Sequence, residues 1–298
     1  MNRVLITGPT GFIGRHCLQR LAVEDCEVHA VSRNAADATS RIHWHTADLR
    51  SSSEARDLIR AVRPSHILHL AWEVTPRAYS QSPQNLRWLH ASLALVSAFG
   101  EIGGSRFVGA GTSAEYEYGH QRCIEDTTPI RPSSIYGMCK AACWLGVDAT
   151  ARVHGFSAAW GRIFLPYGPG DPGARLIPSV VTALREKRPI KTTDGRQLRD
   201  FIYAPDIADL LVRLLFLSEY GAFNIGSGRA TSVRFVMKYI ADRMEGRELL
   251  RLGAIDSAPG DPPVLVADMA KVNRVLGWSV RTSIEAGLDR TLSQSNGW

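Results

Sequence analysis

The chain has 298 residues, 45% of them hydrophobic and 21% charged, and a formal charge of +6. This length and composition fit an ordinary globular protein with one large α/β domain, or one domain with a smaller second lobe. The positive charge does not indicate a nucleic-acid-binding protein, because the arginines are dispersed and no basic block or aromatic-basic RNA motif occurs.

Membrane, secreted and metal-binding classes are not expected either. The sequence has no run of about 18 apolar residues, so we expect no transmembrane helix, and no secretory signal precedes the first strand-like segment. The five cysteines show neither a C-x-x-C pair nor metal-ligand spacing. Such a scattered, odd set is typical of reduced thiols, and we expect a cytoplasmic protein without a metal.

A strand, a glycine-rich turn and a helix open the chain. Residues 3–7 are a short apolar run with β-branched side chains, and residues 12–24 carry a helical pattern. Between them lies G-x-x-G-x-x-G, with Gly8, Gly11 and Gly14. In this context the backbone can approach a pyrophosphate at the N-terminus of the helix. The stretch predicts a dinucleotide-binding loop; a turn without a ligand is the alternative.

The predicted second strand, residues 27–33, indicates which dinucleotide is bound. An acidic residue at its end would bind the ribose 2′-hydroxyl of NAD and repel a 2′-phosphate. Ser32 and Arg33 stand there instead, and their hydroxyl and guanidinium suit a phosphate. We therefore expect NADP(H) to be favoured over NAD(H), unless Arg33 is simply a surface residue. Asp48, after the third strand, either accepts from the adenine amino group or caps the next helix.

The alternation of strands and helices continues through the first half of the chain. We predict further strands at residues 42–46, 66–72, 106–111 and 156–164, and helices at 51–62, 84–100 and 134–154. This rhythm predicts an α/β fold with a doubly wound parallel sheet of the Rossmann type.

Tyr136 and Lys140 are the candidate catalytic pair. Four residues apart on a predicted helix, they share one face, and a nearby ammonium lowers the pKa of a tyrosine toward the working range. Ser113 and Glu115 follow the fifth strand at the carboxyl edge of the sheet. There a hydroxyl can bond a substrate oxygen and a carboxylate can act as a second acid or base, although each alone is also an ordinary turn residue.

The chain leaves the sheet at the Gly/Pro-rich residues 165–173. Beyond them we predict helices at 176–186, 207–217, 232–244, 268–276 and 283–292, and strands at 197–203 and 222–226. We expect a dinucleotide-binding Rossmann domain from residues 1–165 and about 198–226. A smaller, discontinuous C-terminal α/β substrate lobe is expected from about 166–197 and 227–298.

Taken in order along nearly the whole chain, the motifs resemble the extended short-chain dehydrogenase/reductase family, in its nucleotide-sugar-modifying, epimerase/dehydratase-like branch. The matching stretches are Gly8 to Gly14, His69-Leu70-Ala71, the trio Ser113, Tyr136 and Lys140, Tyr167 to Gly170, Arg199 to Tyr203, Asn224 to Gly228 and Leu276-Gly277-Trp278. The resemblance implies cofactor contacts from Gly8, Thr10, Gly11, Phe12, Ile13, Gly14, Ser32, Arg33, Asp48, Leu49, Leu70, Ala71, Tyr136 and Lys140.

The resemblance also implies a nucleotide-diphosphate sugar as substrate, bound by Ser113, Leu176 and Arg199. Tyr136 would exchange the proton of the reacting carbinol, Lys140 would bond the nicotinamide ribose, and Ser113 would orient the oxygen. Arg199 would otherwise form a structural ion pair with Asp200 or Asp206. A homodimer through helices 84–100 and 134–154 is implied in the same way.

Departures from the family pattern bear on the choice of reaction. Trp88 and Leu165 stand where the family often has asparagine, and the arginine of its late R-P-G-D motif is missing before Asp261. The base-binding end is therefore expected to differ from that of the common uridine-diphosphate enzymes. Ser113-Ala114-Glu115 also lacks the aspartate that many 4,6-dehydratases carry there.

We expect NADPH-dependent reduction of the 4-keto group of a nucleotide-activated 4-keto-6-deoxy sugar, with Tyr136 as proton donor, because an exchanging NADPH suits a net reduction. The alternative is a nucleotide-sugar 4,6-dehydratase or 4-epimerase that uses Tyr136 and Glu115. A non-catalytic cofactor-binding protein is a remote alternative, since the chain keeps both the tyrosine and the lysine.

Overall fold

A computed structural model describes residues 1–34, 42–75, 78–258 and 260–294. In these ranges seven parallel strands form the main sheet, in the order β11-β6-β5-β4-β1-β2-β3. They are β1 (Asn2–Thr7), β2 (Cys26–Ser32), β3 (Ile42–Thr46), β4 (His66–His69), β5 (Arg106–Thr112), β6 (Ser157–Ile163) and β11 (Gly221–Ile225). The strand order reverses between β1 and β4, so their carboxyl ends border the crevice where such sheets bind ligands.

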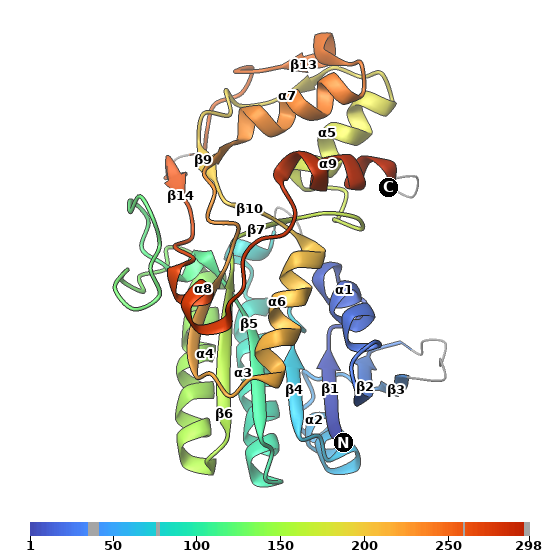
Figure 1. Cartoon of the computed structure of the whole chain (residues 1–298), viewed down its shortest axis with the longest axis vertical. Helices are drawn as coiled ribbons and strands as arrows, with labels where there is room; N and C mark the ends of the chain where they lie inside the picture. Colours follow the sequence, from blue (N-terminus) through green and yellow to red (C-terminus); the bar gives the residue numbers. More distant parts are fainter. Residues whose placement is uncertain (35–41, 76–77, 259, 295–298) are drawn as a thin grey trace.

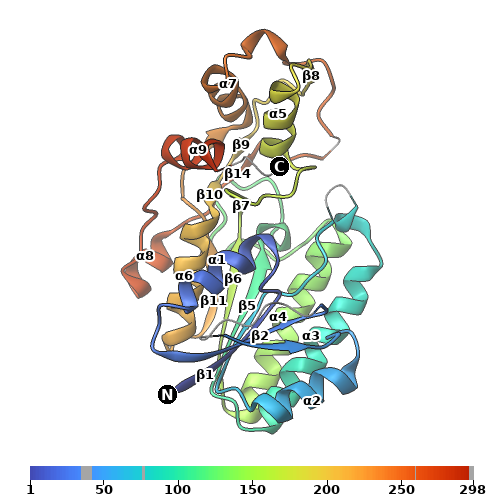
Figure 2. The ribbon, with the colours of Figure 1, turned by 90° about the vertical axis from the view of Figure 1, so that its right-hand side faces the viewer.

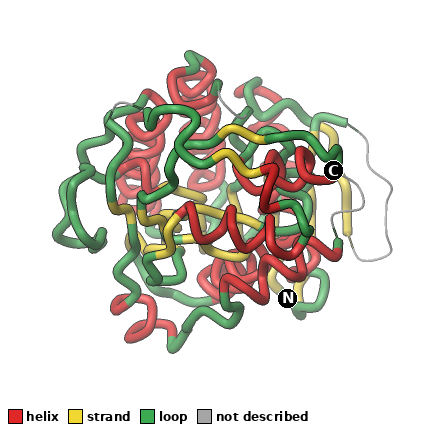
Figure 3. Tube along the Cα trace, turned by 90° about the horizontal axis from the view of Figure 1, so that it is seen from above, coloured by secondary structure: helices red, strands yellow, loops and turns green. Residues whose placement is uncertain are grey.

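Helices cover both faces of this sheet (Figures 1 and 2). One face packs against α2 (Ser52–Val62), α3 (Gln84–Glu101) and α4 (Ile135–His154), and the other against α1 (Phe12–Leu21) and α6 (Ala204–Phe216). Seen from above, helices flank the strands on both sides (Figure 3). The predicted doubly wound Rossmann sheet is therefore confirmed. None of the helices in the described ranges is long and apolar enough to span a membrane.

Capping residues explain where several helices begin and end. The Ser51 hydroxyl accepts a hydrogen bond from the Glu54 amide at 3.4 Å and caps α2. The suggestion that Asp48 caps this helix is therefore wrong. α4 begins after Ser134, whose hydroxyl accepts from the Gly137 amide at 3.1 Å. α6 begins three residues before its predicted start, because a proline in the first turn needs no amide donor.

A second hydrophobic core lies beyond the carboxyl edge of the sheet, in the upper part of Figure 1. It is built by β7 (Leu165–Tyr167), α5 (Leu176–Arg185), β10 (Phe201–Tyr203), α7 (Val233–Arg243) and α9 (Ile284–Ser293). The sequence did not predict β7, which lies in the stretch expected to be a Gly/Pro-rich loop. It also did not predict the short strands β8 (Ile190–Lys191), β12 (Thr231–Ser232), β13 (Leu250–Arg251) and β14 (Val264–Leu265), or the 3-10 helices η1 (Tyr79–Gln81), η2 (Ser113–Glu115) and η3 (Arg247–Leu249). Elements of two or three residues carry no periodic signal.

The predicted strand 197–203 divides into β9 (Leu198–Arg199) and β10. α8 (Ala270–Leu276) brings the chain back to the sheet, since Val272 and Trp278 pack in the core under α1 and α6. Both residues fall in the range that the sequence assigned to the second lobe. The division of the chain into two domains stays a prediction.

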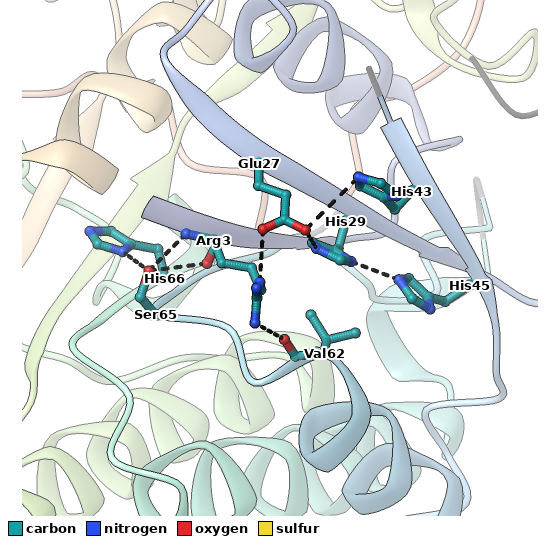
Figure 4. Close-up of polar contacts among 8 residues, drawn as sticks. All are labelled: Arg3, Glu27, His29, His43, His45, Val62, Ser65 and His66. Carbon is teal, nitrogen blue, oxygen red and sulfur yellow. Dashed lines mark hydrogen bonds and ion pairs between the residues drawn. The ribbon is translucent and has the colours of Figure 1, made fainter. Parts of the chain in front are cut away.

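Polar side chains join the edge strand β3 to its neighbour β2 (Figure 4). His29 Nε2 lies 3.0 Å from Glu27 Oε1, and His29 Nδ1 lies 2.8 Å from His45 Nε2 on β3. Burial lowers the pKa of His29 and of His45, which favours neutral rings in this chain. Arg3 forms an ion pair with Glu27, with Nε 2.9 Å from Oε2. In the described ranges no group of three or more histidine, cysteine, aspartate or glutamate side chains is arranged to hold a metal ion.

Candidate active site

The turn after β1 forms an open cradle at the N-terminus of α1. Gly11 caps the helix without a side-chain hydrogen bond, and the first turn carries no acidic residue. A Cβ on Gly14 would collide with the carbonyl oxygen of Gly8, so helix and turn pack as closely as the glycine spacing predicts. The amides of the first turn lack partners within the helix and, with the positive helix end, suit a phosphate. The residues present therefore fit a dinucleotide.

Two arginines surround the position expected for the adenosine ribose. The Ser32 hydroxyl bonds the Asn34 carbonyl, and Arg33 is exposed at the end of β2. Arg50 donates to the Asp48 carboxylate, with Nη2 2.7 Å from Oδ2. This hydrogen bond holds the pKa of Asp48 below its ordinary value, and the charge of Arg33 adds to the effect. The sequence missed Arg50, although it stands only two residues after Asp48.

A buried chain of hydrogen bonds fixes the carboxyl ends of β1 and β4. The Thr7 hydroxyl accepts from the amides of Leu70 and Ala71, at 3.1 Å each, and lies 2.8 Å from His69 Nδ1. His69 Nε2 lies 2.8 Å from the Ser92 hydroxyl on α3. Burial lowers the pKa of His69 to about 3, so the ring is neutral. The predicted Leu70 and Ala71 therefore lie at the crevice of the sheet.

Lys140 is buried close to the end of β5. Its ammonium donates to the Ala110 carbonyl at 2.8 Å and lies 3.9 Å from the centroid of the Trp72 ring. Burial lowers the pKa of Lys140 to about 8. At neutral pH the side chain is still predominantly charged, because its pKa lies above 7.

Tyr136 does not have the lowered pKa that the sequence predicted. Burial raises the pKa of its phenol above the ordinary value, and Tyr79 adds to the rise, while a hydrogen bond with Thr112 and the charge of Arg175 oppose it. The ammonium of Lys140 is directed to a carbonyl and an indole instead. Desolvation therefore outweighs the ion that was expected to stabilise the phenolate.

The hydroxyl of Thr112, a residue that the sequence missed, lowers the pKa of Tyr136, and the expected role of the adjacent Ser113 stays a prediction. A Cβ on Gly137 would collide with the Ala114 carbonyl oxygen, so the start of α4 is pressed against η2. Thr112 is the last residue of β5 and Ser113 is the first of η2, so the two hydroxyls belong to different elements.

Glu115 is fully buried, and both of its oxygens are engaged. Oε1 accepts from the Thr112 amide at 2.8 Å and from the Trp160 indole at 2.9 Å. Oε2 accepts from Arg162 Nε at 2.9 Å in a buried ion pair. These contacts favour a structural role for Glu115, and its expected role as a second acid or base stays a prediction.

A cavity of about 750 Å³ opens beside the second hydrophobic core. Its walls include the predicted Leu176 and Arg199, together with Arg188, Lys191, Thr192, Thr193, Gln197 and Asp261. Arg199 pairs with Asp261 at 2.5 Å, and not with Asp200 or Asp206 as suggested. Asp200 instead accepts from the backbone amides of Ser227, Gly228 and Ala267.

Arg175, which the sequence missed, stands between Ala174 and Leu176, two residues that line this cavity. It precedes α5 and lies 5.6 Å over the Phe12 ring at the start of α1. It donates to the Pro166 carbonyl at 3.1 Å, pairs with Asp171 at 3.1 Å, and its charge reaches Tyr136. A cation therefore stands between the cradle, the tyrosine and the cavity.

Comparisons with known proteins find similar chains. Residues 4–226 match the model of the NAD dependent epimerase/dehydratase family. The chain is 29% identical to a UDP-glucose 4-epimerase of Azospirillum brasilense, over 99% of this chain and 94% of that protein. It is 27% identical to a UDP-glucuronate 4-epimerase of Thermodesulfobacterium geofontis (strain OPF15), over 99% and 96%. The solved structure of MoeE5 in complex with UDP-glucose and NAD has a TM-score of 0.86 and 29% identity, with 98% of each chain covered.

Glu115→Gln tests the role of the buried carboxylate. It leaves the Arg162 guanidinium buried without its counter-charge, so we expect the free energy of unfolding to fall by about 3 kcal/mol in urea titrations. Adding Arg162→Met should restore part of that loss. A Glu115→Gln protein that is as stable as the native one but inactive would contradict the structural role.

Lys140→Met should stabilise the protein. The folded pKa of about 8 lies below the ordinary 10.5, so between these values the unfolded state binds more protons and native stability rises with pH. Removing the charge should raise the free energy of unfolding at pH 7 by roughly 1–3 kcal/mol. The gap between the two proteins should narrow above about pH 8. A variant less stable than native at pH 7 would show that burial of the ammonium costs little.

Proposed function

The chain belongs to the NAD dependent epimerase/dehydratase family, and from that premise we propose that it epimerises a UDP-sugar at C4 without net consumption of a nicotinamide cofactor. Relatives along its whole length are named as UDP-sugar 4-epimerases. A relative of known structure was solved with UDP-glucose and NAD together. The 4-keto reduction expected from the sequence has less support than this alternative.

The engagement of both Glu115 oxygens by other protein groups is the observation that carries the proposal. Tyr136 is the proton-transfer group, Thr112 supplies a hydroxyl near it, and Lys140 supplies an ammonium. Dehydration of a sugar needs a further acid or base beside that group. The carboxylate that could act there is committed to Arg162 and Trp160. Oxidation and reduction at a single carbon need no second carboxylate.

The roles of the residues follow from their contacts. A bound nicotinamide dinucleotide supplies the hydride acceptor and donor. The phenol of Tyr136 would first have to lose its own proton; as the phenolate it would take the proton of the C4 hydroxyl while hydride leaves C4, and it would return that proton when hydride comes back to C4. Thr112 would hold the sugar oxygen near Tyr136. An ammonium has three donors, and the Ala110 carbonyl takes one of those of Lys140. The others are available for ribose hydroxyls.

The second lobe would hold the nucleotide of the substrate. None of Thr112, Tyr136 and Lys140 lines the 750 Å³ cavity, so the cavity suits the part of the substrate remote from the reacting carbon. Arg175 and the N-terminus of α5 face the route between the cavity and Tyr136. A guanidinium and a helix N-terminus both suit a diphosphate. We assign the cofactor to the sheet and the substrate nucleotide to the second core on these grounds.

A 4-ketoreductase is the second candidate, because Arg33 and Arg50 favour a 2′-phosphate over a bare ribose. Such a preference suits an enzyme that exchanges NADPH in every turnover.

The activity can be measured with UDP-glucose or UDP-glucuronate and a trace of dinucleotide. We expect the C4 epimer to form while the absorbance of the reduced cofactor stays constant. Tyr136→Phe removes the proton-transfer group and should lower turnover about 100-fold or more. Thr112→Val should lower it more than the matched control Ser113→Ala. Stoichiometric oxidation of NADPH by a UDP-4-keto-6-deoxy sugar would favour the reductase, and a 4-keto product from UDP-glucose would favour the dehydratase.

Cofactor preference can be measured by titration of the purified protein. NADPH should bind roughly tenfold more tightly than NADH, since one charge-assisted contact to the 2′-phosphate contributes about that much. Arg33→Ala should reduce the difference, whereas Arg60→Ala, an exposed arginine on α2, should leave it unchanged. Equal affinities, or tighter binding of NADH, would contradict the assignment of Arg33.

A further inference from the structure

The orientation of the Trp72 indole is fixed by a buried amide. Trp72 lies just beyond β4, at the carboxyl edge of the sheet, and its Nε1 donates to Asn85 Oδ1 at 2.8 Å. Asn85 is 2% exposed, and its Nδ2 donates to the carbonyls of Tyr79 and Ser82 at 2.6 and 2.9 Å. Both ends of the Asn85 amide are therefore occupied, and the amide cannot turn without losing hydrogen bonds.

The face of this indole meets the Lys140 ammonium. Nζ lies 3.9 Å from the Trp72 ring centroid, and a second indole, Trp160, lies 5.7 Å away. Among the described residues no carboxylate lies within ion-pair distance of Lys140. An unpaired buried ammonium is costly, and an aromatic face close to it offsets part of that cost.

A tryptophan can also be buried simply because it packs in a hydrophobic core, but two observations show that Trp72 is more than a core side chain. Its side chain is only half-buried, although it is one of the largest apolar groups at the crevice. Its ring also contacts Tyr136 edge-on, with centroids 6.4 Å apart and planes at 75°. One side chain therefore contacts both members of the catalytic pair.

We propose that Trp72 is a positioning residue, whose indole, held by Asn85, keeps the Lys140 ammonium charged and in place at the end of β5. The expected effect of Trp72 on turnover rests on the proposed function, whereas the contact between the Trp72 indole and the Lys140 ammonium does not depend on it. The groups that face Lys140 from the packed elements are Glu115 on η2, Cys143 and Tyr136 on α4, and the neutral His69 on β4. The charge of Glu115 is already paired with Arg162, which leaves the Ala110 carbonyl at 2.8 Å and the indole face at 3.9 Å as the stabilising groups of the ammonium.

Titration of Lys140 by NMR tests the proposal without any substrate. The chain has five lysines, of which only Lys140 is buried, so carbon-13-labelled lysine gives few signals and Lys140→Met assigns the relevant one. We expect a midpoint of about pH 8 in the native protein. Trp72→Leu should lower the midpoint by roughly 0.5–1 unit, and Trp72→Phe, which keeps a ring face, by less.

Trp144→Leu is the matched control, because Trp144 is a half-buried tryptophan on α4 that stacks on Trp160 and does not face Lys140. Its midpoint should equal the native one. If Trp72→Leu does not fold, Asn85→Ala frees the indole and should also lower the midpoint. A folded Trp72→Leu protein with an unchanged or raised midpoint overturns the proposal.

The pH profile of turnover distinguishes this proposal from the proposed function. If the protein has epimerase activity, the alkaline limb of the pH profile of Trp72→Leu should move to lower pH by as many units as the NMR midpoint of Lys140. A shifted NMR midpoint in a protein without epimerase activity would reject the proposed function and retain the role of Trp72. If the Trp72→Leu enzyme is active and its NMR midpoint is lowered while the alkaline limb of its pH profile stays in place, the role of Trp72 in positioning Lys140 for turnover is rejected.

Discussion

A buried positive charge at the carboxyl edge of the sheet governs the arrangement of the site. The ammonium of Lys140 has a carbonyl and an indole face as neighbours, and its pKa is lowered to about 8. The nearby carboxylate of Glu115 cannot neutralise it, because that carboxylate is paired with Arg162. The site therefore keeps a cation without a carboxylate partner among the described residues, and burial raises the pKa of the Tyr136 phenol near it in the sequence.

The fold supplies the other half of the site by joining distant segments at the point where the strand order reverses. The Thr7–His69–Ser92 chain fixes the ends of β1 and β4 and the middle of α3. The first turn of α1 presents its amides beside them, and Arg175, at the N-terminus of α5, lies over the Phe12 ring. A dinucleotide and a diphosphate are both anionic, and each finds a helix N-terminus or a guanidinium in this arrangement.

Much of this could be predicted from the sequence, because long elements and glycine spacing are local signals. The strands of the main sheet, the cradle at Gly8 to Gly14 and the pair on α4 follow from periodicity, turn residues and the family resemblance. Contacts between distant residues could not be predicted in this way. The partner of Glu115, Arg162, lies 47 residues further along the chain, and the partner of Arg199 is Asp261, which the sequence did not suggest. Thr112 was missed because the sequence does not show at which residue β5 ends and η2 begins.

The central claim is that the reaction at C4 is an oxidation and a reduction at one carbon, without loss of water and without net use of cofactor. A UDP-sugar carrying deuterium at C4 tests it most directly when it is incubated with the protein in ordinary water. The account predicts that the C4 epimer keeps its deuterium, because the hydrogen leaves and returns at the same carbon. A C4 epimer that has lost the label to solvent, or a 4-keto product that has lost water, would contradict it.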